Sequence, residues 1–177
     1  AAGGVGQIAV QWAKALGATV IGTVGSEDKA AIARSLGCDH VINYREEAFA
    51  PRVRELTQGR GVPVVFDSVG AATFEGSLDS LAPRGMLVSF GNASGAVPPV
   101  SPNVLAAKGS LYLTRPRLAD YTATRAELLE TSADLFAVIS SGQVRISIGQ
   151  RYALAEVAQA HADLAGRRTQ GSSVLLP

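Results

Sequence analysis

The residues best suited to chemistry in this sequence are the small ones at its start. Alanine or glycine stands at positions 1, 3 and 6 of the run Ala1-Ala2-Gly3-Gly4-Val5-Gly6. A turn without bulky side chains lets backbone N–H groups approach a diphosphate, and a helix that begins there adds partial positive charge. Apolar residues follow at helical spacing, at Val5, Ile8, Ala9, Trp12 and Leu16. The run therefore predicts a diphosphate-binding turn that opens a helix. Flexible-loop glycines before an ordinary helix are the alternative.

A buried strand is predicted over residues 18–24, after Gly17 ends this helix. Turn, helix and strand together fit a βαβ unit whose first strand would stand before Ala1. The sequence has no initiator methionine or signal peptide ahead of the turn. We therefore expect it to be a fragment of a longer protein, with the first strand of its sheet missing.

The tip of this strand predicts which dinucleotide binds. A carboxylate there would accept the ribose hydroxyls of NAD, whereas small residues with a nearby cation suit the 2′-phosphate of NADP. The tip is Thr23-Val24-Gly25-Ser26, and Lys29 follows. This favours NADP, although Glu27 or Asp28 could act as the NAD acid and Lys29 could be a solvated helix charge. Both acids stand in the first turn of a helix that Ser26 caps, where acids are common.

Strands and helices alternate through the next ninety residues. We expect helices at 27–36 and 46–57, a helix carrying Phe74, Leu78 and Leu81 that ends at 83–85, and a short helix before Lys108. Strands are expected at 40–44, 62–67, 86–90 and 110–114. Polar, glycine-bearing turns follow two of the strands, at 68–70 and 91–95. The carboxyl ends of parallel strands share one sheet edge, so these turns and Tyr44 are placed where a cofactor would lie. Tyr44 could equally be a surface ring.

The pattern predicts an α/β fold, a Rossmann-like doubly wound parallel sheet over residues 1–118. A tail over residues 119–177 changes character. Its expected elements are helices at 124–141 and 154–165 and strands at 144–148 and 172–176, with no phosphate-binding turn. The helices have apolar faces and no place in the sheet. We expect them to pack on a domain that the sequence lacks.

Composition narrows the function classes. A net charge of +1 gives no support for nucleic-acid binding, and no apolar run approaches the roughly 20 residues that span a bilayer. Cys38 is the single cysteine and His40 and His161 are the two histidines, so no metal site is expected. The lone cysteine fits a reducing cytoplasm.

Five motifs together resemble those of the NADPH:quinone oxidoreductases, the zinc-free, zeta-crystallin-like branch of the medium-chain dehydrogenase/reductase superfamily. They are Ala1–Gly6, Val41-Ile42-Asn43-Tyr44, Asp67-Ser68-Val69-Gly70, Ser89-Phe90-Gly91-Asn92 and Thr169-Gln170-Gly171-Ser172-Ser173. The resemblance covers the whole chain, with the motifs in family order. It implies NADPH as cofactor, a quinone as substrate and a GroES-like catalytic domain outside this sequence, which the tail would complete.

The resemblance also implies roles for individual residues. Gly3, Gly4, Val5 and Gly6 would meet the pyrophosphate, Ser26 and Lys29 would hold the 2′-phosphate, and Tyr44 would flank it. Ser68 would lie near the adenosine, whereas Phe90, Gly91, Asn92, Ser94, Thr114 and Arg115 would lie near the nicotinamide. Arg167, or its neighbour Arg168, would reach back to the cofactor. A homodimer would form through Leu111–Leu113, and no catalytic residue is assigned.

Two alternatives remain open at this stage. The protein could be another medium-chain reductase, acting on enones or alcohols, or a non-catalytic NADPH-binding or structural protein, since family membership does not enforce activity. We expect residues 1–177 on their own to lack quinone reductase activity, and to be oligomeric or poorly folded.

Overall fold

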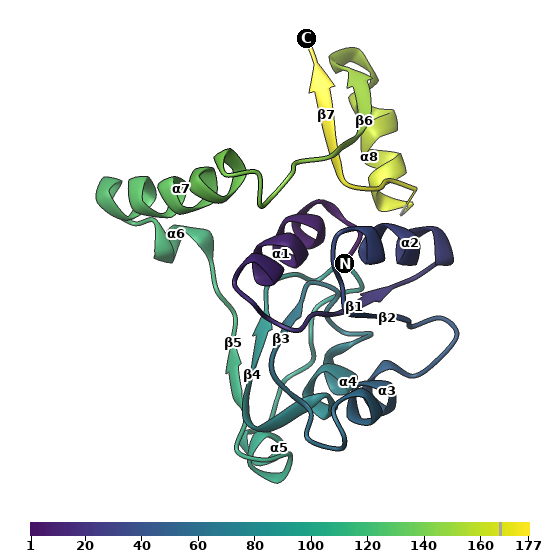
Figure 1. The fold of residues 1–177 in the computed structure, drawn as a ribbon, viewed down its shortest axis with the longest axis vertical. Coiled ribbons are helices and arrows are strands. Elements are labelled where there is room, and N and C mark those ends of the chain that lie inside the picture. The colour runs from purple at the N-terminus through teal and green to yellow at the C-terminus, as the bar shows by residue number, and fades with distance from the viewer. Residues whose placement is uncertain (167) are drawn as a thin grey trace. The chain divides into compact units, whose positions relative to one another are not determined.

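A computed structural model describes residues 1–166 and 168–177 as an α/β protein with parallel strands (Figure 1). The elements are α1 (Gly4–Ala15), β1 (Ile21–Val24), α2 (Glu27–Ser35), β2 (His40–Asn43), α3 (Phe49–Leu56), β3 (Val62–Asp67), α4 (Phe74–Asp79), β4 (Leu81–Ser89), α5 (Pro102–Ala107), β5 (Tyr112–Thr114), α6 (Leu118–Tyr121), α7 (Arg125–Ser140), β6 (Ile148–Ala153), the 3₁₀ helix η1 (Leu154–Glu156), α8 (Val157–Ala165) and β7 (Ser172–Leu176). The predicted fold class, α/β with parallel sheets, is confirmed. Arg167 lies outside the described residues, so its predicted role is not addressed.

Within the described residues the strands form three separate sheets, with orders β1-β2, β3-β4-β5 and β6-β7. All the strand pairs are parallel. The chain falls into two compact units. One contains Ala1–Glu46 and Thr131–Pro177, and the other contains Glu47–Glu130. The domain boundary predicted from the sequence lies after residue 118.

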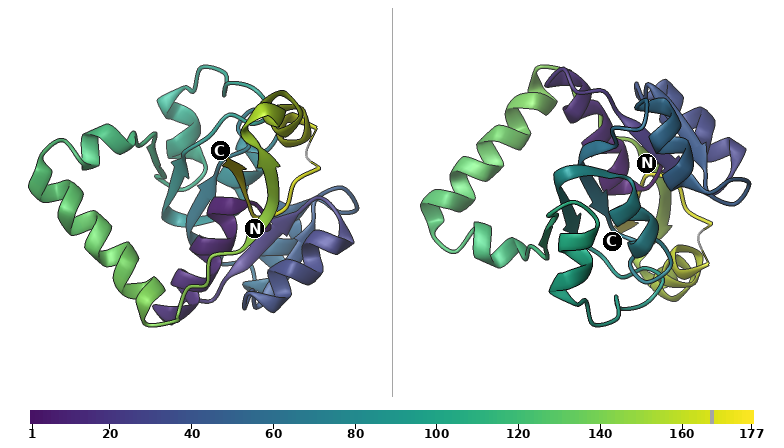
Figure 2. Two further views of the ribbon diagram at one scale, coloured as in Figure 1. Left: turned by 90° about the horizontal axis from the view of Figure 1, so that it is seen from above. Right: turned by 90° about the horizontal axis from the view of Figure 1, so that it is seen from below.

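The core of the first unit is formed by side chains of α1, β1 and α2 and of the segment before β2. Val10 of α1 and Ala30 and Ala33 of α2 are buried with Val24 and Cys38. Ser26 caps α2 as predicted, because its hydroxyl accepts from the Lys29 N–H at 3.4 Å. In the tail, β6 pairs with β7 and α8 lies beside β6 (Figures 1 and 2).

The second unit packs α4 on one face of the sheet β3-β4-β5. Phe74 and Leu78 of α4 bury Leu81, Leu87 and Leu111, and three of these five side chains are fully enclosed. The other face presents partly exposed apolar side chains, at Val64, Phe66, Met86 and Tyr112. Since Leu111 belongs to the core, Tyr112 and Leu113 are the residues of the predicted dimer segment whose side chains are exposed.

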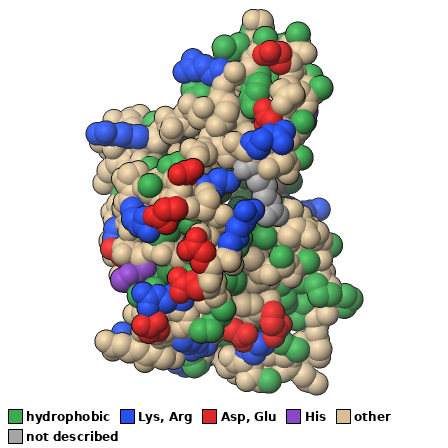
Figure 3. Space-filling model, turned by 90° about the vertical axis from the view of Figure 1, so that its right-hand side faces the viewer, with side chains coloured by type: hydrophobic (Ala, Val, Ile, Leu, Met, Phe, Trp, Pro, Cys, Tyr) green, Lys and Arg blue, Asp and Glu red, His purple; other side chains and the backbone are tan. Residues whose placement is uncertain are grey.

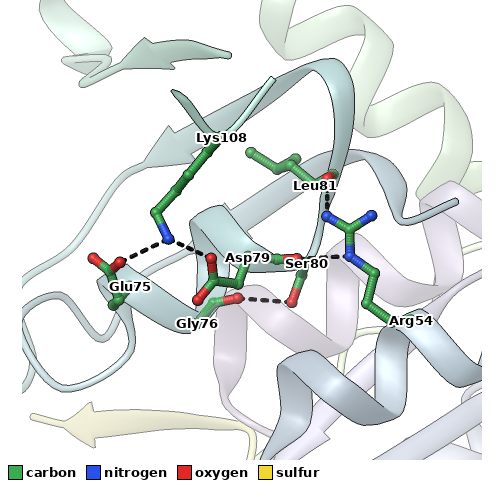
Figure 4. A network of polar contacts seen from close by, with 7 residues as sticks. All are labelled: Arg54, Glu75, Gly76, Asp79, Ser80, Leu81 and Lys108. Carbon is green, nitrogen blue, oxygen red and sulfur yellow. Dashed lines mark hydrogen bonds and ion pairs between the residues drawn. The ribbon is translucent and has the colours of Figure 1, made fainter. Parts of the chain in front are cut away.

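The end of α4 corrects one prediction. Leu81 was expected on the helix and 83–85 at its end, but β4 already begins at Leu81, which pairs with Val62. Arg54 fixes this junction by donating to the carbonyls of Asp79 and Leu81, at 2.9 and 2.7 Å (Figure 4). Lys108 adds ion pairs to Glu75 and Asp79 on α4 (Figure 4). Arg54 thus satisfies one carbonyl at the helix end and one at the start of the strand, at the point where the chain turns directly from α4 into β4.

The tail corrects a second prediction. The strand expected at 144–148 lies at Ile148–Ala153, and Val144 is instead a buried residue before it. The apolar face expected on the long helix is present on α7, with Leu128, Leu129 and Phe136 between 48% and 63% exposed.

Candidate functional site

The glycine turn opens α1, as predicted. Gly3 occupies the N-cap position with extended backbone, and no described side chain caps the helix. A Cβ built on Gly3 would meet nothing within 4 Å, so the turn is open on that side. A Cβ on Gly6 would lie 2.7 Å from the Ala1 carbonyl oxygen, so Gly6 permits the tight turn itself. The backbone of this turn is therefore accessible to an anion at a helix N-terminus.

The C-terminal segment meets this turn within the same unit. Gly171 forms an isolated parallel bridge with Gly3, and its N–H donates to the Ala2 carbonyl at 3.2 Å. A Cβ on Gly4 would lie 3.1 Å from Ser172 Oγ. Further along α1, the Gln11 carboxamide makes paired hydrogen bonds of 3.1 and 3.0 Å with the backbone of Arg145. These contacts were not predicted from the sequence; the glycine in the 169–173 motif was the signal for a close approach.

The tip of β1 brings together Gly25, Ser26 and Tyr44. A Cβ on Gly25 would lie 2.6 Å from the Tyr44 hydroxyl oxygen, so the ring covers the tip because position 25 has no side chain. Lys29 is half-buried on the first turn of α2, close to its cap Ser26. Glu27 pairs with Arg34 on its own helix at 2.5 Å. That pairing disfavours Glu27 as a ribose-binding acid.

The second unit holds the 68–70 turn after β3 and the 91–95 turn after β4. Asp67, 6% exposed, lies at the base of the first of these turns. Its carboxylate accepts from the N–H groups of Val69 and Gly70, at 2.7 and 3.1 Å. It also accepts from the hydroxyls of Thr73, at 2.8 Å, and Ser77, at 2.7 Å. Ser68 is exposed at the edge, whereas Phe90, Gly91 and Ser94 are half-buried.

An open hollow of about 310 Å³ adjoins the second of these turns. It is lined mainly by apolar residues of the 96–100 loop, by Phe74 and by Leu113, with Ser89, Asn92 and Arg115 as its polar members. Arg115 donates from Nη1 to the Ser89 carbonyl at 3.0 Å. Thr114 pairs with Val88 in the sheet. Asn92, Thr114 and Arg115 thus lie at the carboxyl ends of β4 and β5, at the sheet edge predicted from the sequence.

Residues 1–166 and 168–177 were also searched for a metal site, a reactive cysteine and a membrane-spanning helix. They hold no group of three or more His, Cys, Asp or Glu placed to bind a metal. Burial raises the pKa of the Cys38 thiol, which disfavours the nucleophilic thiolate. None of the helices described is long and apolar enough to cross a membrane. On the face in Figure 3, Lys and Arg side chains are interspersed with Asp and Glu.

Comparison with known proteins assigns a family. Residues 4–133 match the zinc-binding dehydrogenase family, and the chain belongs to it. It is 57% identical over 177 residues to a quinone oxidoreductase of Pseudomonas aeruginosa, covering 100% of this chain and 54% of that protein. It is 50% identical over 178 residues to a 2-haloacrylate reductase of a Burkholderia species, covering 100% of this chain and 54% of that protein.

The fold of the chain also matches that of a solved structure. Escherichia coli quinone oxidoreductase complexed with NADPH superposes with a TM-score of 0.96 at 54% identity, over 99% of this chain and 55% of that one. The resemblance to quinone oxidoreductases predicted from the five motifs is confirmed. The chain spans about half the length of the curated relatives it matches.

Proposed function

We propose that this chain binds NADPH as part of a protein that transfers hydride from the cofactor to a quinone. The observation that carries the proposal is the open glycine turn at the uncapped N-terminus of α1. The tip of β1, with Ser26, Lys29 and Tyr44, adds a place for a phosphorylated ribose. Relatives that are 54–57% identical are quinone oxidoreductases, and one of them was solved with NADPH.

In the first unit, the backbone of Gly3–Gly6 would hold the pyrophosphate. Ser26 and Lys29 would hold the 2′-phosphate, with Tyr44 beside them. In the second unit, Ser68 would serve the adenosine side, and Phe90, Gly91, Asn92, Thr114 and Arg115 the nicotinamide side. Arg167 would add a cation from the C-terminal segment.

NADPH supplies the hydride, and the protein supplies binding, orientation and exclusion of water. The described residues offer phosphate-binding backbone and hydroxyl donors at sheet edges, which is the chemistry that a dinucleotide requires. We assign no catalytic acid or nucleophile to this chain.

Activated alkenes are the second candidate class of substrate. The chain is 50% identical to a 2-haloacrylate reductase, and a 2-haloacrylate is an activated alkene.

The test is NADPH oxidation by the full-length protein with a quinone, an activated alkene and an alcohol in parallel. We expect turnover with the quinone to exceed the other two. If the alkene is turned over faster than the quinone, the alkene is the substrate and the quinone proposal is wrong. If none of the three compounds is turned over, a binding or structural role is favoured.

We also propose that the protein acts in the cytoplasm as a homodimer, joined along the outer edge of β5. Tyr112 is 59% exposed and Leu113 37% exposed, and both stand on the last strand of their sheet. Such a pairing would satisfy edge backbone groups that otherwise invite aggregation.

Cofactor preference provides the next prediction. Lys29→Ala should weaken NADPH binding by about tenfold to a hundredfold, because a charge-assisted contact to phosphate is worth roughly 1.5–3 kcal/mol. NADH, which lacks the 2′-phosphate, should bind nearly as before. Isothermal titration of the full-length protein measures both.

A matched control is Lys14→Ala, which removes a lysine of the same unit that pairs with Asp39 at 2.8 Å. It should leave both affinities unchanged. Equal dissociation constants of the unmutated protein for NADPH and NADH would contradict the assigned 2′-phosphate site.

A further inference from the structure

The 68–70 turn and the 91–95 turn are joined by a continuous set of backbone hydrogen bonds. The Phe90 N–H donates to the Asp67 carbonyl at 2.8 Å, and the Ser94 N–H donates to the Val69 carbonyl at 2.7 Å. Two longer bonds, of 3.2 Å each, run from Ala93 N–H to the Ser68 carbonyl and from Ala71 N–H to the Gly95 carbonyl. The two turns therefore form one hydrogen-bonded layer, although twenty residues lie between them in the sequence.

Two glycines allow this close approach. A Cβ on Gly91 would lie 2.4 Å from the Ser68 carbonyl oxygen and 2.9 Å from its Cα. A Cβ on Gly70 would lie 2.5 Å from the Gly95 carbonyl oxygen. Real Cβ atoms do not come so close to backbone, so neither position tolerates a side chain while the turns stay in contact. The absence of a side chain at Gly91 thus serves the neighbouring turn.

The side chain of Ser94 completes the connection. Its hydroxyl donates to the Val69 carbonyl at 2.7 Å and accepts from the Ala72 N–H at 2.9 Å. A serine hydroxyl has one hydrogen to donate, and here that hydrogen is directed to the 68–70 turn. Resemblance to the family places Ser94 on the nicotinamide side of the cofactor. Its contacts in the structure are with the opposite turn.

We propose that Ser94 is a positioning residue that holds the 68–70 turn, on the proposed adenosine side, against the 91–95 turn, on the proposed nicotinamide side. Its hydroxyl acts on the cofactor through the backbone of Val69 and Ala72 and not by touching the nicotinamide. This inference rests on the proposed NADPH binding. Its consequence is specific: loss of the hydroxyl weakens a ligand that carries the adenosine and no nicotinamide.

The test uses the full-length protein and the probe 2′,5′-ADP, which lacks the nicotinamide half. Ser94→Ala is expected to raise the dissociation constants of 2′,5′-ADP and NADPH by similar factors, about threefold to tenfold. Ser94→Thr keeps the hydroxyl and should restore binding of both. Amide hydrogen exchange at Ala72, the N–H that Ser94 holds, should be faster in Ser94→Ala and unchanged in Ser94→Thr.

Ser80→Ala is the matched control. Its hydroxyl is buried in the same unit and, at the C-cap of α4, donates to the Gly76 carbonyl at 2.8 Å and not to either turn (Figure 4). It should lower the melting temperature without changing 2′,5′-ADP affinity. Thermal unfolding of each variant separates loss of stability from loss of binding.

The outcomes are distinguishable. Weaker NADPH binding with unchanged 2′,5′-ADP binding in Ser94→Ala would show direct contact with the nicotinamide half and overturn the proposal. Unchanged affinity for both ligands would leave Ser94 a purely structural residue and would also overturn it. An unmutated protein that binds neither ligand would refute the proposed function itself, a result that the variants are not needed to reveal.

Discussion

Gly3→Val in the full-length protein is expected to lower NADPH affinity by about a hundredfold or more, with little change in the melting temperature. The backbone at Gly3 has φ −77° and ψ 171°, a conformation that valine adopts readily. A Cβ there would meet nothing within 4 Å, so the described residues leave open space at the point where the side chain begins. The same open space is where a pyrophosphate must approach the turn, and a branched side chain would occupy it. Calorimetric titration and thermal unfolding measure the two effects.

Gly6→Val is the contrasting variant on the same turn. Its Cβ would lie 2.7 Å from the Ala1 carbonyl oxygen and 2.8 Å from the Ala1 carbonyl carbon, so the turn must open. We expect this variant to lose stability and binding together. If Gly3→Val binds NADPH with unchanged affinity, the turn is a connector and its glycines have no role in phosphate binding.

Sequence patterns predicted well those elements whose ends depend on neighbouring residues in the sequence. Ser26 followed by Glu27 and Asp28 indicates a capped helix, and the structure shows the serine hydroxyl accepting from the Lys29 N–H. The strands before the 68–70 and 91–95 turns were recognised from short apolar runs ending in polar, glycine-bearing segments. Their parallel pairing then places both turns at one edge of their sheet.

The predictions were wrong or incomplete where contacts with residues distant in the sequence determine the structure. Leu81 continues the helical spacing of Phe74 and Leu78, yet β4 begins there because Arg54 binds the carbonyls around the junction. The strand expected at Val144 lies further along, because β6 is defined by its pairing with β7, whose partner residues are 23 or 24 positions away in the sequence. The bridge between Gly3 and Gly171 spans almost the whole chain, so the glycine in the 169–173 motif could indicate a close approach but not which residue it approaches.

In the candidate site, the sequence predicted the positions of residues better than it predicted their contacts. The motifs identified which residues lie at the sheet edges, but a residue's position does not reveal what its side chain contacts. Ser94 and Gly91 both lie in the 91–95 turn, and both hold the neighbouring 68–70 turn. Asp67 was named within a motif but given no role of its own, although four separate groups donate to its carboxylate. An aspartate at the end of a strand, before a glycine turn and a helix, was the available signal.

Asp67→Ala is therefore expected to destabilise the full-length protein by about 3 kcal/mol or more. The substitution removes the acceptor for two backbone N–H groups and for the hydroxyls of Thr73 and Ser77, and Ser77 is itself buried. Each buried donor left without a partner costs roughly 1–3 kcal/mol. Urea denaturation monitored by circular dichroism measures the free energy of unfolding.

Two further aspartate variants make this measurement diagnostic. Asp67→Asn keeps one acceptor oxygen and the side-chain volume, so it should lose less stability than Asp67→Ala, since the hydroxyls of Thr73 and Ser77 can rotate to accept from the amide. Asp79→Ala removes a carboxylate of the same unit that is 47% exposed and pairs with Lys108, and exposed pairs contribute about 1 kcal/mol or less. If Asp67→Ala destabilises no more than Asp79→Ala does, the hydrogen bonds to Asp67 do not hold the 68–70 turn in place.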